Sequence, residues 1–307
     1  MSADIHSAHA ARPEASAGLL AAAVSASLYG ISAPFARMAA EANLIGADLI
    51  LWRVGVMVCV LGLATWVLGR RPLAPRAAWP GVLLFAATVL MVGTCYLSAV
   101  AFIPVGIAVV IFYTFPLIIL LVSPFIDRRR PTPAQFVAFA LAFAGLVLAI
   151  GPQWTTLDPR GLALAAMASV ACAVQVFTGS RVGRRLDPLT FAFSAQLVVV
   201  PGVFLVALAF GGPAGPEALG AALKPLSVIV LTYIAAFVLQ LRAMRLAAPS
   251  AVGLVFTLEP VIAIATAAAL LGEKLVTSQY MGVALVLAGL VVAVAPGASK
   301  GRKDSAA

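Results

Sequence analysis

The chain has 307 residues, of which 63% are hydrophobic and only 10% are charged, and its mean hydropathy is +1.09. Soluble domains have roughly 45–50% apolar and about 25% charged residues, so this composition excludes a soluble enzyme, a disordered protein and a coiled coil. The net charge of +9 does not indicate a nucleic-acid partner, because the basic residues lie in short clusters between apolar runs.

Ten apolar runs follow one another along the chain, bounded by Pro, Gly or charged residues. Each is close to the roughly 20 residues that one membrane-spanning helix needs, and an isolated span in lipid must satisfy its own backbone. The expected fold is therefore all-α, a polytopic membrane protein with ten transmembrane helices. The expected spans are residues 18–37, 46–68, 80–102, 104–126, 133–151, 160–181, 188–210, 225–246, 250–271 and 276–296.

The basic residues between these spans predict the orientation. With the N-terminus in the cytoplasm, fifteen Lys and Arg residues lie in cytoplasmic segments and four lie at outer ends. Short cytoplasmic loops carry an excess of such residues, so both termini are expected inside. The cytoplasmic set is Arg12, Arg70, Arg71, Arg76, Arg128, Arg129, Arg130, Arg181, Arg184, Arg185, Arg242, Arg245, Lys300, Arg302 and Lys303, and the outer set is Arg37, Arg160, Lys224 and Lys274.

An internal repeat relates the two halves. A shift of 144 residues pairs Thr88 with Thr232, Phe112 with Phe256, Pro116 with Pro260 and Gln135 with Gln279. Each half holds five spans, and an odd number gives the halves opposite orientations, which is the 5+5 inverted repeat of many transporters. The expected units are a cytoplasmic tail at 1–17, repeats at 18–151 and 152–297, and a cytoplasmic tail at 298–307.

Residues 245–293 resemble the second repeat of the EamA family, within the drug/metabolite transporter superfamily. The motifs that carry the resemblance are Leu258-Glu259-Pro260, Gly272-Glu273-Lys274 and the spacing Gln279…Gly282…Gly289. The first half is similar through Arg53 and Phe112…Pro116, and departs at Arg129, where the family often has an acidic residue.

The resemblance implies a secondary transporter of the bacterial inner membrane that exports amino acids or related amphipathic metabolites by alternating access. The aromatic amino-acid exporters are a plausible neighbouring branch, which the motifs do not separate from threonine/homoserine exporters. A proton-coupled multidrug exporter and a passive channel-like facilitator are the alternatives. The expected partners are a small-molecule substrate and lipid, and the expected assembly is a monomer or homodimer. No enzyme, cofactor or metal motif is found in the sequence.

Polar and aromatic side chains inside the spans predict the cavity. Such polar groups are costly in lipid, so they either face a cavity or join helices together. Joining is the commoner role of a single Ser or Thr, whereas the positions matched between the repeats favour a cavity lined by spans 1, 3, 4, 6, 8 and 9. The candidates are Tyr29, Ser32, Thr88, Tyr96, Phe112, Tyr113, Gln175, Thr232, Gln240, Phe256 and Thr257.

Two charged residues lie inside expected spans. Glu259 falls near the middle of span nine, where a carboxyl group must be neutral or paired, and its repeat mate is Phe115. It is either a coupling or ammonium-binding group, or a structural residue at a kink. Arg53 is close enough to the outer end of span two to reach the interface, or it attracts a substrate carboxylate.

Two prolines occupy equivalent positions near the middle of spans four and nine. Because proline removes a helix hydrogen bond, Pro116 and Pro260 are expected to mark the hinges of alternating access.

Overall fold

The computed structural model describes residues 2–44, 46–126, 128, 131–151, 157–209 and 212–294, and in this part of the chain the regular elements are all helical. The expected C-terminal tail, together with Arg129 and Arg130, lies outside the described residues. The elements are α1 (Ser2–Glu41), α2 (Gly46–Val67), the 3-10 helix η1 (Arg76–Ala78), α3 (Trp79–Ala99), α4 (Val105–Phe112), α5 (Phe115–Ile126), α6 (Pro133–Ile150), α7 (Pro159–Gly183), α8 (Pro188–Ala209), α9 (Pro216–Ala221), α10 (Leu223–Leu246), α11 (Pro249–Val255), α12 (Leu258–Leu271) and α13 (Thr277–Val294).

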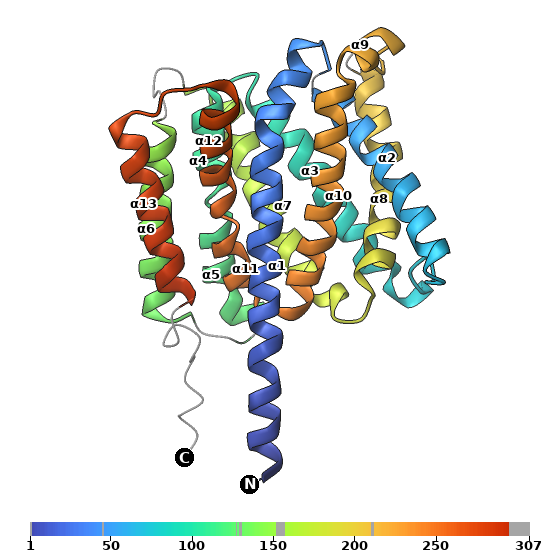
Figure 1. Ribbon diagram of the computed structural model, residues 1–307. Helices are drawn as coiled ribbons and strands as arrows, with labels where there is room; N and C mark the ends of the chain where they lie inside the picture. The colour runs from blue at the N-terminus through green and yellow to red at the C-terminus, as the bar shows by residue number, and fades with distance from the viewer. Residues whose placement is uncertain are drawn as a thin grey trace.

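The helices follow the expected spans closely. In the described part of the chain, nine helical segments are long and apolar enough to cross a membrane, and the shorter apolar helix Thr277–Ala293 occupies the tenth position. The protein is therefore an all-α polytopic membrane protein. The main difference lies at the N-terminus, where α1 begins at Ser2 and not at residue 18. The preceding segment is rich in alanine, the best helix former, so it extends the helix beyond the bundle (Figure 1).

Spans four and nine are each broken into two helices. Residues Tyr113–Thr114 separate α4 from α5, and residues Phe256–Thr257 separate α11 from α12. The expected bends thus occur as breaks a few residues before the prolines. Pro116 and Pro260 lie in the first turn of the second helix of each pair. A proline is tolerated there because the N–H groups of a first turn have no partner within the helix.

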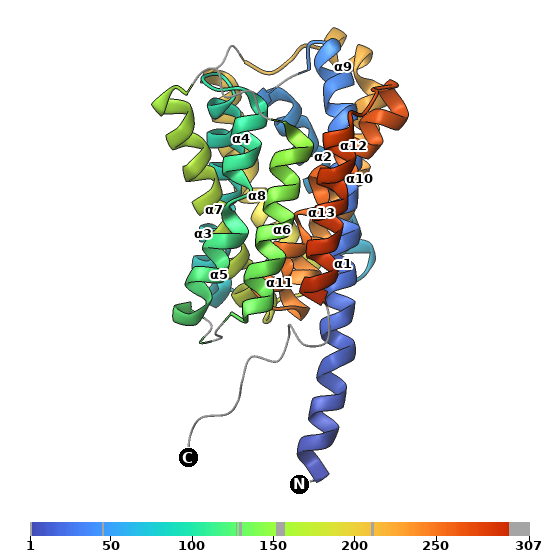
Figure 2. The ribbon, with the colours of Figure 1, turned by 90° about the vertical axis from the view of Figure 1, so that its left-hand side faces the viewer.

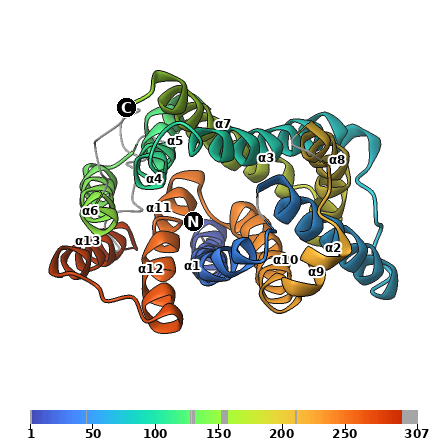
Figure 3. The same cartoon turned by 90° about the horizontal axis from the view of Figure 1, so that it is seen from above.

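The bundle consists of two rows of helices with a helix pair at each end (Figure 3). One row contains α12, α1 and α10, and the other contains α4 with α5, α7 and α3. The pair α6 and α13 closes one end, and the pair α2 and α8 closes the other. Because α6 and α13 pack mainly on each other, they lie at the periphery of the bundle (Figure 2).

Contacts within the two rows are related by the repeat. Helix α1 packs on α10 as α7 packs on α3, and the repeat aligns α1 with α7 and α3 with α10. Within α1, a Cβ atom added to Gly18 would lie 2.9 Å from the Cβ of Ala247. At the start of α7, a Cβ on Gly161 would lie 2.7 Å from Ile103 Cγ2. Since Ile103 and Ala247 are 144 residues apart, the same close approach occurs once in each half.

Glycine residues allow the peripheral pair to pack backbone to backbone. A Cβ atom on Gly145 of α6 would lie 2.5 Å from the carbonyl oxygen of Gly282 on α13, and a Cβ on Gly282 would meet the carbonyl oxygen of Gly145 at the same distance. Gly289 is similarly close to the carbonyl oxygen of Ala138, at 2.7 Å. Small residues at such positions favour association in lipid, because they let van der Waals contacts form between backbones.

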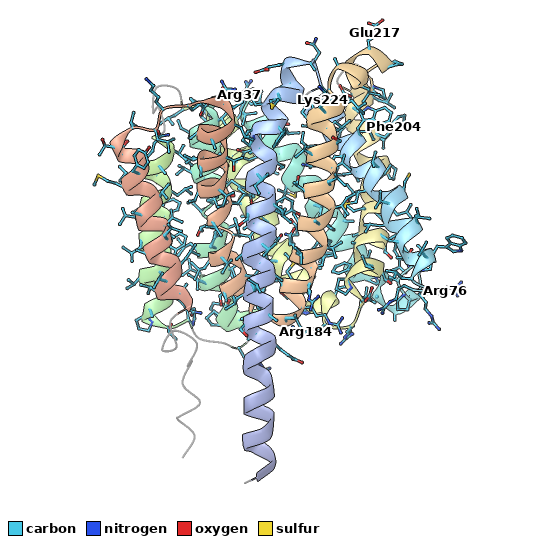
Figure 4. All side chains as sticks on the ribbon, in the orientation of Figure 1. Arg37, Arg76, Arg184, Phe204, Glu217 and Lys224 are labelled. Atoms are coloured by element: carbon cyan, nitrogen blue, oxygen red, sulfur yellow. The ribbon has the colours of Figure 1, made fainter. Side chains whose placement is uncertain are left out.

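Charged side chains gather at the two ends of the bundle (Figure 4). Arg76 and Arg184 lie at the end from which the N-terminal helix emerges, and Arg37 and Lys224 lie at the opposite end. At that opposite end Arg37 forms an exposed ion pair with Glu273, which joins α1 to the segment after α12. The middle of the bundle, between these ends, holds the polar residues described next.

Candidate functional site

Tyr29 on α1 is at the centre of a group of aromatic and amide side chains. Its hydroxyl donates a hydrogen bond to Oε1 of Gln240 on α10, with an oxygen–oxygen distance of 2.8 Å. Its ring centroid lies 5.8 Å from that of Tyr233 and 6.3 Å from that of Phe256, which immediately follows α11. Helices α1 and α10 and the break between α11 and α12 therefore meet at this tyrosine.

Arg53 extends from α2 into the same group. Its guanidinium carbon lies 3.9 Å from the centroid of the Tyr233 ring, within the range of a cation–π contact. Its Nε is buried and has no hydrogen-bond partner among the described residues. Gln196 of α8 donates from Nε2 to the Tyr233 hydroxyl at 3.4 Å, while its Oε1 is buried and unpartnered. The guanidinium thus faces the bundle interior, where it retains an unused donor.

A second aromatic group surrounds the break in span four. Tyr96 of α3 packs edge-to-face on Phe112, with a centroid distance of 5.5 Å. Phe112 in turn contacts Tyr113 at 5.3 Å and Phe115 at 5.5 Å. The broken helix therefore places successive aromatic rings in the opposite row, across from Tyr29.

Glu259 connects the two groups. It is the second residue of α12, directly after the break in span nine, and its side chain is half-buried. Its carboxyl group lies near enough to Tyr113 and Arg53 for both side chains to interact with it electrostatically. Within the described residues, however, Glu259 has no ion pair within 4.0 Å.

These residues form one arrangement, which we call the central cluster. It combines aromatic rings, two amides, one cation and one carboxyl group, and its members are buried or half-buried. Ligand sites commonly have this composition, with apolar walls and a few polar groups that fix orientation. The central cluster consists of Tyr29, Arg53, Tyr96, Phe112, Tyr113, Phe115, Gln196, Tyr233, Gln240, Phe256 and Glu259.

The remaining expected cavity residues are mainly bonded within their own helices. Thr88, Thr232 and Thr257 donate to carbonyl oxygens three or four residues earlier in the chain, and Ser32 donates to the carbonyl oxygen of Tyr29. Ser and Thr often use such local bonds inside helices. Gln175 is buried on α7. Among the described residues, none of these five side chains has a hydrogen bond or ring contact with a side chain of the central cluster, and Ser32 reaches only the backbone of Tyr29.

Two members of the cluster were missed in the sequence. Tyr233 and Gln196 lie in spans eight and seven, and neither has a matching polar residue at the 144-residue shift used to select candidates. A shift of 143, which pairs Gly18 with Gly161, would have paired Arg53 with Gln196. That match is a signal only once Arg53 is known to face the interior.

The chain matches the EamA-like transporter family twice, over residues 16–151 and again over residues 159–295. It therefore belongs to this family of membrane transporters, within the drug/metabolite transporter superfamily, and it is a multi-pass membrane protein.

Similar curated proteins include the threonine/homoserine exporter RhtA of Escherichia coli K12, which is 31% identical over 200 residues, and RhtA of Salmonella typhimurium LT2, which is 30% identical over 195 residues. In each case the alignment spans 63% of this chain and 63% of the relative. A solved crystal structure with 19% identity superposes with a TM-score of 0.76, over 91% of this chain and 96% of the other, which shows the fold alone.

Proposed function

We propose that this protein exports amino acids, or closely related amphipathic metabolites, across the bacterial inner membrane by alternating access. Two RhtA relatives bear the name of threonine/homoserine exporters, and the inverted repeat is a scaffold on which two halves rock around a central site. The central cluster is the proposed substrate site. Both termini are proposed to lie in the cytoplasm.

The observation that carries this proposal is the pair of charged groups in the middle of the bundle. Ionisable residues inside a membrane are costly and are normally retained for function. Arg53 and Glu259 lie in different helices, without an ion pair between them, and aromatic rings flank both. A cation and a carboxylate that do not neutralise one another favour a ligand that carries both charges.

Counterflow in proteoliposomes tests the proposal. Vesicles containing the purified protein are loaded with one unlabelled amino acid at a time, and uptake of the labelled form is followed against protein-free vesicles. We expect saturable uptake of at least one neutral amino acid, with threonine and homoserine as the first compounds to test. Uptake that rises linearly with concentration would instead indicate a channel-like facilitator.

The aromatic walls favour a second candidate, a proton-coupled exporter of bulky apolar compounds. The seven aromatic rings of the central cluster, from α1, α3, α10 and the residues around the two helix breaks, contact one another in two groups, and such surfaces accept apolar ligands of varied shape. This candidate predicts that lipophilic cations compete for transport better than amino acids do. It also predicts that Glu259→Gln abolishes the dependence of transport on a proton gradient.

A further inference from the structure

We propose that the central cluster binds its amino acid in one fixed orientation, with the carboxylate on Arg53 and the ammonium group on Glu259. This inference rests on the proposed function and specifies how its site distinguishes substrates. Arg53 and Glu259 are thereby assigned as specificity-determining residues that touch the substrate.

Arg53 is arranged to receive a carboxylate. The Tyr233 ring covers one face of its guanidinium at 3.9 Å, which leaves the edge of the planar group, with its N–H donors, free for a ligand. Its buried Nε has no acceptor among the described residues, and neither of the ion pairs found there involves Arg53. A guanidinium binds carboxylates in its own plane through paired hydrogen bonds, so the stacked arrangement preserves the geometry that such binding requires.

Glu259 supplies the opposite charge. A carboxylate is an acceptor only, and an ammonium group offers three donors. The Tyr113 side chain interacts with its carboxyl group, and no Lys or Arg in the described chain forms an ion pair with it. The break before α12 places this residue at the start of a helix, with its side chain half-buried.

The two repeats differ at the charged positions, so the site has one cationic side and one acidic side. The 144-residue shift pairs Glu259 with Phe115, and the 143-residue shift pairs Arg53 with Gln196. Each charged residue therefore has a neutral counterpart in the other half, although the helices around it are duplicated. If the two halves carried identical residues, each charge would occur twice or not at all. Because each charge occurs once, a zwitterion has one orientation in which its carboxylate faces α2 and its ammonium group faces α12.

Contacting rings connect the two charged residues. The Tyr29 ring centroid lies 5.8 Å from that of Tyr233, which covers Arg53, and 6.3 Å from that of Phe256, three residues before Glu259. The Tyr29 hydroxyl donates a hydrogen bond to Gln240. A neutral amino acid carries both of its charged groups on one carbon atom, and in the proposed orientation its side chain would face these aromatic rings.

Three related inhibitors test the orientation in counterflow. They are the transported amino acid, its amino alcohol, which lacks the carboxylate, and its deamino acid, which lacks the ammonium group. With the wild-type protein we expect both analogues to inhibit about 30-fold more weakly, or worse, as is typical when one partner of a buried charge pair is removed. Arg53→Gln should make the amino acid and the amino alcohol equally weak while still rejecting the deamino acid. Glu259→Gln should produce the reverse pattern.

Arg37→Gln and Glu273→Gln are matched controls, because they remove the same charges from the exposed ion pair at the end of the bundle. Both should retain the wild-type ranking. If the glutamine variants are not monodisperse after purification, Arg53→Lys and Glu259→Asp replace them. Arg53→Lys should reduce only the difference in inhibition between the amino acid and the amino alcohol. Glu259→Asp should reduce only the difference between the amino acid and the deamino acid. The inference is overturned if each variant weakens all three inhibitors equally. It is also overturned if Arg53→Gln removes the discrimination against the deamino acid and Glu259→Gln removes that against the amino alcohol. Transport of no amino acid by the wild-type protein overturns the proposed function itself.

Discussion

Charged and small residues have distinct roles inside this bundle. Arg53 and Glu259 are ionisable residues in membrane-spanning helices, where an unpaired charge costs several kcal/mol, and the cation–π contact with Tyr233 offsets part of this cost for Arg53. Gly30 contributes by having no side chain. A Cβ atom at this position would lie 2.5 Å from the carbonyl oxygen of Glu259 and 2.8 Å from the Cβ of Ile262. The absence of a side chain therefore sets how closely α1 approaches α12.

Gly30→Val should destabilise the protein. The added side chain meets backbone that cannot rotate away, and overpacking of this kind typically costs about 1–3 kcal/mol. Thermal unfolding of the purified protein in detergent should show a lower Tm than wild type. Gly55→Val is the control, because a Cβ atom at this position in α2 meets nothing within 4 Å. Equal Tm values for the two variants would show that α1 and α12 separate without cost.

At the scale of elements, the two broken helices are the features most suited to conformational change. Their breaks occupy equivalent positions in the two repeats, and α5, which follows one break, packs on α11, which precedes the other. Each second helix begins with a turn that contains a buried proline. A break leaves backbone groups without their usual helical partners, so the two halves of a span can change angle at small cost.

Pro116→Ala and Pro260→Ala should shift the protein toward opposite facing states. Alanine favours continuation of the helix through the break, and the inverted repeat makes closure of span four at one side equivalent to closure of span nine at the other. Cysteines introduced at Tyr96 and at Gln240, in a background without Cys59, Cys95 and Cys172, report access from each side. Labelling of both variants at wild-type rates, together with normal transport, would show that the prolines contribute to packing and are not hinges.

The whole molecule has a basic end and an opposite end with fewer arginines. Arg76 and Arg184 lie at the end from which the N-terminal helix emerges, whereas Arg37 lies at the other (Figure 4). Arg70 also forms an ion pair with Asp187, at 3.5 Å, between the segments that follow α2 and precede α8. The proposed cytoplasmic location of the N-terminal end would accord with the positive-inside rule.

A reporter fused after Ala307 should be cytoplasmic. An enzyme active only in the periplasm, such as a phosphatase, should be silent in this position, and a cytoplasmic fluorescent reporter should be active. The matched fusion, placed after Glu41 at the opposite end of α1, should give the reverse result. A periplasmic C-terminus would remove the basis for the inverted repeat, because the two halves would no longer hold five spans each.

Much of the fold follows from local sequence. A run of about 20 apolar residues has few alternatives to a helix in lipid, so the limits of most spans could be predicted to within a few residues. The breaks were predicted only approximately, because proline identifies a disturbed turn without specifying where the preceding helix ends. The N-terminal extension of α1 was missed because hydropathy detects where a span is apolar and says nothing of how far a polar helix continues.

The central cluster could be predicted in part, and the reason lies in the direction of side chains. The sequence by itself determined that Tyr29, Tyr96, Tyr113 and Glu259 are polar groups inside spans, since composition and the repeat are readable along the chain. It could not determine that Tyr233 would cover Arg53, or that Gln196 would reach the same tyrosine. Only the tertiary structure decided these contacts, because they depend on the rotation and packing of helices far apart in sequence, and a hydrophobic environment on all sides leaves no amphipathic pattern from which that rotation can be read.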